Sequence, residues 1–215
     1  SITTRTAEEK VPSPAASWHF DESTGTTAQD ASGNNVDGTL TNGPLWKAPA
    51  ECIQGSCIYF DGTNDYVATP TSNTVRGLST FSISAWFKPT RLNGTEQNIY
   101  VEPRNSDGSV RAQLTIDSSN QLSFGVRAPD AGSFIELVND NRTLEVNKWY
   151  HVVAVFNATS DIHTIYLNGV GKTSSVAVAA IDNTNPSSNA PRIGSNIGSG
   201  YFQGFLDEVR LYKYA

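Results

Sequence analysis

Apolar and polar residues alternate along several short segments of the chain. In FSISAWFKP (81–89), every second residue from Phe81 to Phe87 is apolar or small, and the side chains between them point to the opposite face. A period of two predicts a β-strand that buries one face. IHTIYLNG (162–169) alternates in the same way and ends on the turn signal Asn-Gly. WYHVVAVFN (149–157), the most hydrophobic run, is predicted to be a central strand.

Further strands are predicted at the two ends of this region. SWHF (17–20) is a first strand and GFLDEVRLYKY (204–214) a last one, while CIYFDG and DYVATP form a hairpin-like pair around residues 62–64. Clusters of Asp, Asn, Gly, Ser and Thr separate the strands, and no helix of ten residues or more is expected. A dozen or so short strands with frequent turns predict an all-β, two-sheet antiparallel sandwich.

Length and composition agree with one such domain. The chain has 215 residues, of which 38% are hydrophobic and only 17% charged. We expect residues 1–16 to be a linker or N-terminal arm and 17–215 to be the folded domain. The net charge of −6 argues against nucleic-acid binding, and no apolar run is long enough for a membrane span. The start without Met suggests a processed or excised piece, a module of a larger protein.

The two cysteines, Cys52 and Cys57, are spaced for a disulfide that closes a small turn. Their spacing does not match a CxxC redox motif, and no nearby residues complete a zinc site. A disulfide indicates an oxidising compartment, so the protein is expected to be extracellular, secreted or on the cell surface. Asn93, Asn141 and Asn157 begin glycosylation sequons, which matter only in a eukaryotic secretory pathway.

The order of six segments resembles the laminin G-like jelly-roll domains of the concanavalin A-like lectin/glucanase superfamily. These segments are WHFDESTGTTAQDASGNNVDGTL, CIYFDGTNDYV, FSISAWFKP, NKWYHVVAVFN, IYLNGV and GFLDEVRLY, and they span residues 17 to about 213. The resemblance implies two curved antiparallel sheets with the first and last strands close together. It does not settle function, because the superfamily holds enzymes, lectins and adhesion modules.

The same resemblance implies a structural Ca²⁺ shared by Asp21 and Asp207, with Asn35 and Gly38 as further contributors from the loop. Calcium requires six to eight oxygen ligands, and the segment 21–38 is rich in carboxylates and amides. The alternative is that the acidic and amide side chains of this loop only cap turns.

Catalytic patterns are absent from the sequence. A retaining glucanase needs alternating acidic residues on one strand, whereas Asp207 and Glu208 are adjacent and are expected to point to opposite faces. The three histidines, His19, His151 and His163, lie in predicted strands with no nucleophile beside them, and packing is the favoured interpretation. We therefore expect the protein not to be an enzyme.

A carbohydrate-binding surface needs flat aromatic rings beside polar side chains. Three tryptophans in predicted strands, Trp18, Trp86 and Trp149, are interpreted as packing residues. The candidate ligand-binding residues are instead Tyr66, Tyr201, Arg104 and Asn105, with Trp46, Tyr100 and Asp107 as further exposed possibilities.

The leading hypothesis is a non-catalytic extracellular recognition module that binds a glycan or another extracellular partner and holds a structural calcium. The alternative is a structural spacer or assembly module with no ligand of its own.

Overall fold

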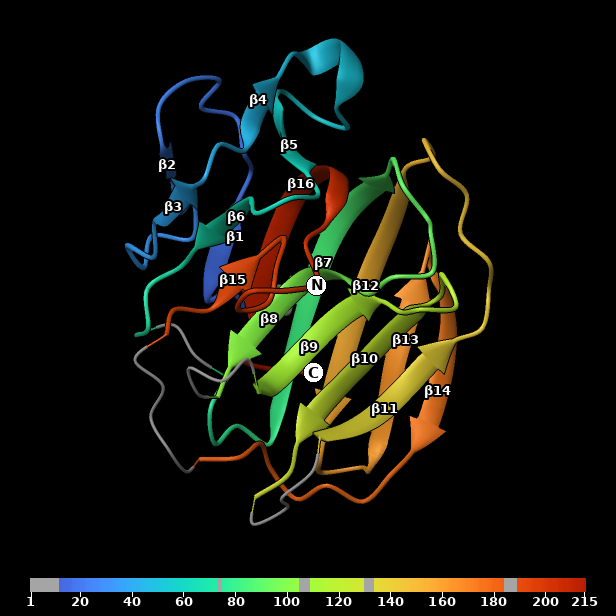
Figure 1. Ribbon diagram of the computed structural model, residues 1–215. Coiled ribbons are helices and arrows are strands. Elements are labelled where there is room, and N and C mark those ends of the chain that lie inside the picture. Colours follow the sequence, from blue (N-terminus) through green and yellow to red (C-terminus); the bar gives the residue numbers. More distant parts are fainter. Residues whose placement is uncertain (1–11, 73–74, 105–108, 130–133, 184–188) are drawn as a thin grey trace, which may run out of the picture.

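The computed structural model describes residues 12–72, 75–104, 109–129, 134–183 and 189–215. Two antiparallel sheets of eight strands each pack face to face, and this layering is visible in Figure 1. The predicted all-β sandwich is therefore confirmed. Of the predicted N-terminal arm, residues 1–11 lie outside the described part of the chain, and the first strand begins at Ala16.

The first sheet has the strand order β14-β13-β12-β7-β16-β5-β4, with β1 paired to β16 beside β5. Its strands are β1 (Ala16–Trp18), β4 (Leu45–Lys47), β5 (Cys57–Asp61), β7 (Thr80–Pro89), β12 (Tyr150–Asn157), β13 (Ile162–Leu167), β14 (Val170–Ser175) and β16 (Gln203–Tyr212). The pairing of β1 with β16 confirms that the first and last strands are neighbours.

The second sheet has the order β11-β10-β9-β8-β15-β6-β3-β2. Its strands are β2 (Thr27–Ala28), β3 (Gly38–Thr41), β6 (Tyr66–Ala68), β8 (Gln97–Pro103), β9 (Val110–Ile116), β10 (Leu122–Arg127), β11 (Phe134–Asp140) and β15 (Arg192–Ile193). One short 3-10 helix, η1 (Pro49–Glu51), follows β4.

The core lies between the two sheets and follows the predicted alternation. In β7 the inward side chains are Phe81, Ile83, Ala85 and Phe87, all fully buried. Phe81 meets Phe124 of the opposite sheet edge to face, with ring centroids 5.8 Å apart. Because inward and outward residues alternate, the side chains between these core positions lie on the outer face of the first sheet.

The expected hairpin around residues 62–64 is wrong. β5 belongs to the first sheet and β6 to the second, so the chain crosses between layers at this point. The sequence could not show this, because both segments alternate equally well and a sheet-to-sheet crossing uses the same turn residues as a hairpin.

Candidate functional site

The outer face of the first sheet carries half-exposed aromatic side chains. Trp86 projects from β7, and Trp149 stands immediately before β12. Neither tryptophan belongs to the core cluster, whereas Trp18 is completely buried in it. The interpretation of Trp86 and Trp149 as packing residues is therefore wrong, and that of Trp18 is confirmed. The alternation of 81–89 already placed Trp86 on the outer side.

Five of these outer side chains form a compact group, which we call the lysine–aromatic cluster: Lys47, Tyr59, Lys88, Trp149 and Phe205. The Phe205 ring meets Tyr59 and Trp149 edge to face, with centroids 5.0 and 6.2 Å away. Strand pairing explains the arrangement, because Phe205 of β16 lies between Tyr59 of β5 and Lys88 of β7. The two lysines lie over these rings.

The ammonium groups of the cluster make cation–π contacts. Lys88 Nζ is 3.9 Å from the centre of the Phe205 ring and 5.1 Å from that of Trp149. Lys47 Nζ is 5.0 Å from the Tyr59 centroid and 6.0 Å from the Phe205 centroid. Partial burial lowers the pKa of Lys88 below its ordinary value, while the negative charge of Glu51 acts in the opposite direction.

A disulfide-closed loop supports one side of the lysine–aromatic cluster. The predicted Cys52–Cys57 bond is confirmed, with an S–S distance of 2.05 Å. Immediately before it, the Glu51 carbonyl accepts hydrogen bonds from Lys88 Nζ at 3.1 Å and Trp149 Nε1 at 3.3 Å. Glu51, which ends η1 next to Cys52, therefore orients both side chains from outside the sheet.

The same outer face continues along the sheet as a mixed aromatic and polar surface. Trp86 and His151 are opposite each other in β7 and β12, and their rings are 5.0 Å apart. His151 Nε2 lies 3.1 Å from the Ser84 hydroxyl. Burial and the positive charge of Arg210 hold the pKa of His151 below its ordinary value. Tyr166, on the next strand, is 41% exposed.

The two carboxylates of the predicted calcium site face the disulfide loop. Asp207 Oδ2 accepts the backbone N–H groups of Ile53 at 3.0 Å and Gln54 at 3.2 Å, and Asp21 Oδ1 accepts that of Ser56 at 2.7 Å. Burial raises the pKa of Asp207 to about 6, although these N–H groups act to lower it. Gly55, with a φ of +55°, has no room for a Cβ because Asp21 Oδ1 fills that place.

The other two predicted calcium contributors lie on a different part of the loop. Asn35 adopts a left-handed conformation with φ 55°, and Gly38 begins β3, where a Cβ would strike Val67. Between them and β1, Asp30 caps the loop by accepting backbone N–H groups, among them those of Ser32 and Val36. Within the described residues, no group of three or more His, Cys, Asp or Glu side chains gathers around a possible metal position.

Asp207 and Glu208 do not point to opposite faces, so that expectation is wrong. The register of β16 against β7 shifts between Asp207 and Arg210, and Glu208 has a φ of +53°. This irregularity inserts an extra residue and turns Glu208 to the outer face, where it pairs with Arg210 and with His19 Nδ1 at 3.0 Å. The sequence carries a trace of this bulge, because two consecutive polar residues, Asp207 and Glu208, separate the core residues Leu206 and Val209.

His19 also lies 3.3 Å from the Ser17 hydroxyl, so it stands between a serine and a carboxylate. Ser17 is only 3% exposed, which leaves no approach for a substrate to its oxygen. His163 is fully buried and stacks on Phe156 at 5.1 Å. The packed or half-exposed interpretation of the histidines is confirmed.

The ligand candidates named from the sequence that the structure describes do not belong to the lysine–aromatic cluster. Tyr66, on the second sheet, is covered by the Arg192 guanidinium, whose central carbon is 4.1 Å from the ring centre. Tyr201 is half-exposed on the segment before β16, and Asn105 and Asp107 lie outside the described residues. Tyr100, expected to be exposed, is only 1% exposed, which contradicts that expectation.

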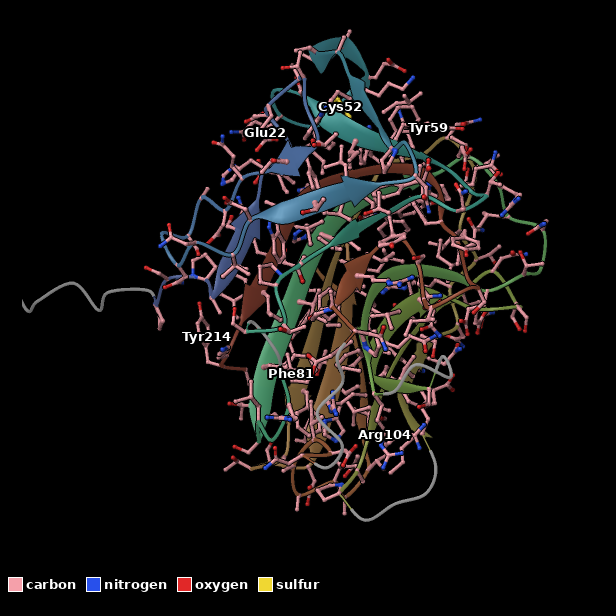
Figure 2. The ribbon with its side chains drawn as sticks, turned by 60° about the vertical axis from the view of Figure 1, so that its left-hand side comes forward. Glu22, Cys52, Tyr59, Phe81, Arg104 and Tyr214 are labelled. Carbon is pink, nitrogen blue, oxygen red and sulfur yellow. A yellow bond between two sulfur atoms is a disulfide. The ribbon has the colours of Figure 1, made fainter. Side chains whose placement is uncertain are left out.

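Arg104 belongs to an ion-pair network at the opposite end of the molecule. Figure 2 shows Arg104 at one end of the sandwich and Tyr59 and Cys52 at the other. Arg104 Nε is 2.7 Å from the buried Asp182 carboxylate, and the Asp182 carbonyl accepts a hydrogen bond from Arg111 Nε. Arg111 also pairs with Glu102 at 3.3 Å, and both are 2% exposed. These contacts show Arg104 packed into a paired network.

A cleft of about 310 Å³ lies beside β4, lined by Ser23, Trp46, Lys47, Ala48, Pro49 and Ser56. Trp46 Nε1 donates to the Gly25 carbonyl at 2.8 Å, and the Ser23 and Ser56 hydroxyls bond each other at 2.8 Å. The Trp46 N–H and the two serine hydroxyls are thus already engaged in internal hydrogen bonds, and of the lining residues Lys47 also belongs to the lysine–aromatic cluster.

No sequence pattern predicts that Lys47, Tyr59, Lys88, Trp149 and Phe205 form one group. They come from β4, β5, β7, β16 and the residue before β12, and only the strand order of the sheet brings them together. The alternation of 81–89 predicts that Lys88 points outward, but it does not predict that Phe205 and Trp149 lie beside it.

Comparison with known proteins agrees with this architecture. The family model Laminin_G_3, described as the concanavalin A-like lectin/glucanases superfamily, matches residues 61–215. A search of curated proteins found no significant match.

Several solved structures share the fold at low sequence identity. Domain 4 of AbnA, a GH43 extracellular arabinanase from Geobacillus stearothermophilus solved in complex with arabinotriose, has a TM-score of 0.69, is 18% identical, and covers 93% of this chain and 92% of its own. The binding domain of Paraclostridial Mosquitocidal Protein 1 has a TM-score of 0.68 and 18% identity over 94% of this chain and 49% of its own. Trypanosoma rangeli sialidase in complex with the inhibitor DANA has a TM-score of 0.61 and 14% identity over 93% of this chain and 30% of its own.

Proposed function

The chain belongs to the concanavalin A-like lectin/glucanase superfamily, and we propose that it is a non-catalytic recognition module that binds saccharides on the outer face of its first sheet. The observation that carries this proposal is the half-exposed position of Trp86 and Trp149 on a rigid sheet, next to lysine, imidazole and guanidinium groups. Sugar rings stack their apolar faces on such aromatic side chains, and neighbouring polar groups bond the hydroxyls.

The similar structures support a binding role without fixing a ligand. Domain 4 of AbnA was solved with arabinotriose, and a second neighbour is named a binding domain. Sialidase is an enzyme, but this chain covers only 30% of it. In the chain itself the paired carboxylates Asp207 and Glu208 are buried, so they are poorly placed for glycoside hydrolysis.

The proposed module also holds a structural calcium through Asp21 and Asp207. The support is that Asp207 Oδ1 is buried with no hydrogen-bond partner in the described part of the chain, although its companion oxygen accepts two N–H groups. A divalent cation supplies the missing positive partner for that oxygen. Bound there, calcium would tie β16 and the segment after β1 to the disulfide loop. Asn35 and Gly38 are the least supported of the four contributors.

We place the module outside the cell. The Cys52–Cys57 disulfide favours an oxidising compartment. No helix in the described ranges is long and apolar enough to cross a membrane.

The experiment is a glycan array with the complete chain and three variants. Trp86→Ala and Trp149→Ala are expected to lower the signal of every bound glycan about tenfold or more, because each removes a stacking surface. Tyr66→Ala is the matched control: it removes an aromatic ring from the outer face of the other sheet, and we expect it to leave binding unchanged.

Two outcomes would contradict the proposal. Binding that Tyr66→Ala abolishes and Trp149→Ala leaves intact would move the site to the second sheet. If no glycan on the array binds the unmodified chain, the spacer or assembly role replaces saccharide recognition.

A further inference from the structure

The lysine–aromatic cluster contains two ammonium groups that form no salt bridge with a carboxylate of the described residues. Within the described residues, no carboxylate lies within salt-bridge distance of Lys47 Nζ or Lys88 Nζ. Among the described residues, the Glu51 carbonyl accepts a hydrogen bond from Lys88, and the Glu51 carboxylate acts on the ammonium through space. Arginines elsewhere contrast with this, since Arg104, Arg111, Arg142 and Arg210 all pair with carboxylates.

Covering apolar surface is the simplest role for such lysines, because their aliphatic stems pack on rings while the ammonium stays in water. That role explains contacts of the stem. It does not explain why two ammonium groups from different strands share one ring, Phe205, with Lys88 Nζ only 3.9 Å from its centre. Bringing two cations together costs free energy that an anion placed between them would recover.

We propose that the lysine–aromatic cluster recognises an acidic saccharide, whose carboxylate or sulfate group lies against Lys47 and Lys88 while its ring packs on Trp149 and Tyr59. This inference rests on the proposed saccharide-binding function and names the chemical class of its ligand. Lys88 already uses one N–H on Glu51, which fixes the direction of the two that remain. Charge-assisted hydrogen bonds from both lysines are stronger than neutral ones.

Because the protein is negatively charged overall, binding of an acidic saccharide depends on the local charges of the lysine–aromatic cluster. The chain carries 21 acidic and 15 basic residues, so its net field repels a polyanion. Binding of an acidic sugar therefore requires a specific site, and it is expected to survive at salt concentrations that screen the net repulsion.

The test is a calorimetric titration of the complete chain with three tetrasaccharides: tetragalacturonate, its carboxyl-reduced counterpart, and that neutral counterpart sulfated at O6. We expect at least one acidic form to bind about tenfold more tightly than the neutral form. The two acidic arms distinguish a carboxylate from a sulfate as the preferred anion. Lys47→Gln and Lys88→Gln should each remove most of the preference.

Lys172→Gln is the matched control, because Lys172 is an exposed lysine on the far edge strand β14 of the same sheet. It should leave the preference intact. Equal binding of acidic and neutral forms, or a preference that Lys47→Gln and Lys88→Gln do not reduce, overturns the inference while leaving saccharide recognition in place. Failure of all three sugars to bind, together with an empty glycan array, overturns the proposed function as well.

Discussion

The basic side chains at the two ends of the sandwich have different partners: carboxylates at one end and aromatic rings at the other. At the end distant from the disulfide, Arg104 and Arg111 face the buried carboxylates of Asp182 and Glu102. At the disulfide end, Lys47 and Lys88 face aromatic rings, and the buried carboxylate nearby, Asp207, accepts only backbone N–H groups in the described structure. In Figure 2, Arg104 and Cys52 mark these opposite ends of the molecule.

This difference indicates that the arginine end contributes to stability, whereas the lysine end is suited to binding a ligand. A buried, paired arginine can offer nothing to a ligand without breaking its own ion pair, and breaking such a pair is costly. An ammonium held on an aromatic ring has hydrogen-bond donors to spare, and so does the half-exposed surface around it. Arg104, which the sequence favours as a ligand-binding residue, is partly exposed but already pairs with the buried Asp182 carboxylate, so it is a less suitable candidate than Lys88.

The largest expected change in the free energy of unfolding comes from a substitution at the arginine end. Glu102→Ala leaves the Arg111 guanidinium buried without its carboxylate, so the free energy of unfolding should fall by about 3–5 kcal/mol. Lys47→Ala, the counterpart at the disulfide end, should cost about 1 kcal/mol or less, since it removes only cation–π contacts. Urea titrations measure both. If the two variants destabilise equally, the two ends do not differ as described.

Calcium would give Asp207 the positive partner that arginine gives Asp182. At a calcium concentration 100 times its Kd, the free energy of unfolding should rise by about 2.7 kcal/mol, and EDTA should reverse the rise. Asp207→Asn should abolish the response, whereas Asp182→Asn should retain it in a less stable protein. Identical melting temperatures in EDTA and in calcium would contradict a metal at this site.

Removing the disulfide should lower the stability of the protein and weaken saccharide binding at the lysine–aromatic cluster. Cys52→Ser with Cys57→Ser releases the loop that follows Glu51, and the loop-entropy estimate is a loss of about 2 kcal/mol in unfolding free energy. Because the Glu51 carbonyl orients Lys88 and Trp149, saccharide affinity should fall as well. Calorimetry on the folded double variant measures this. Unchanged affinity would show that the loop does not position the cluster.

The smallest effect concerns His151, which lies on the same outer face. Its pKa is held below the ordinary value by burial and by Arg210. The unfolded chain therefore takes up a proton on this imidazole at a higher pH than the folded protein, so its contribution to stability falls as the pH drops below about 6.5. NMR titration should show the His151 pKa rising in Arg210→Gln, and a lower pKa in that variant would contradict the account.

Much of the fold follows from the sequence. The strict alternation of 81–89 fixes which side chains of β7 reach the core, and the spacing of Cys52 and Cys57 fixes their bond. The crossing between β5 and β6 does not follow, because turn residues between two alternating segments do not specify the partner strands.

Much less of the candidate site can be predicted from the sequence. The lysine–aromatic cluster depends on β16 lying between β5 and β7, a long-range pairing with no local signal. Two adjacent polar residues, Asp207 and Glu208, interrupt the alternation of β16, but they do not show which of the two adopts the positive φ that forms the bulge. The alternation of 81–89 places Trp86 on the outer side, but only the strand order brings Trp149 together with Phe205 and Lys88.

The indole N–H groups of the four tryptophans test the central claim most directly. In an NMR titration with the preferred acidic tetrasaccharide, the indole signals of Trp149 and Trp86 should shift, because both lie on the outer face of the first sheet. The signals of Trp18, which is buried in the core, and of Trp46, which lines the cleft beside β4, should stay in place. A shift of Trp46 with Trp149 unmoved would contradict the account and place the ligand in the cleft beside β4.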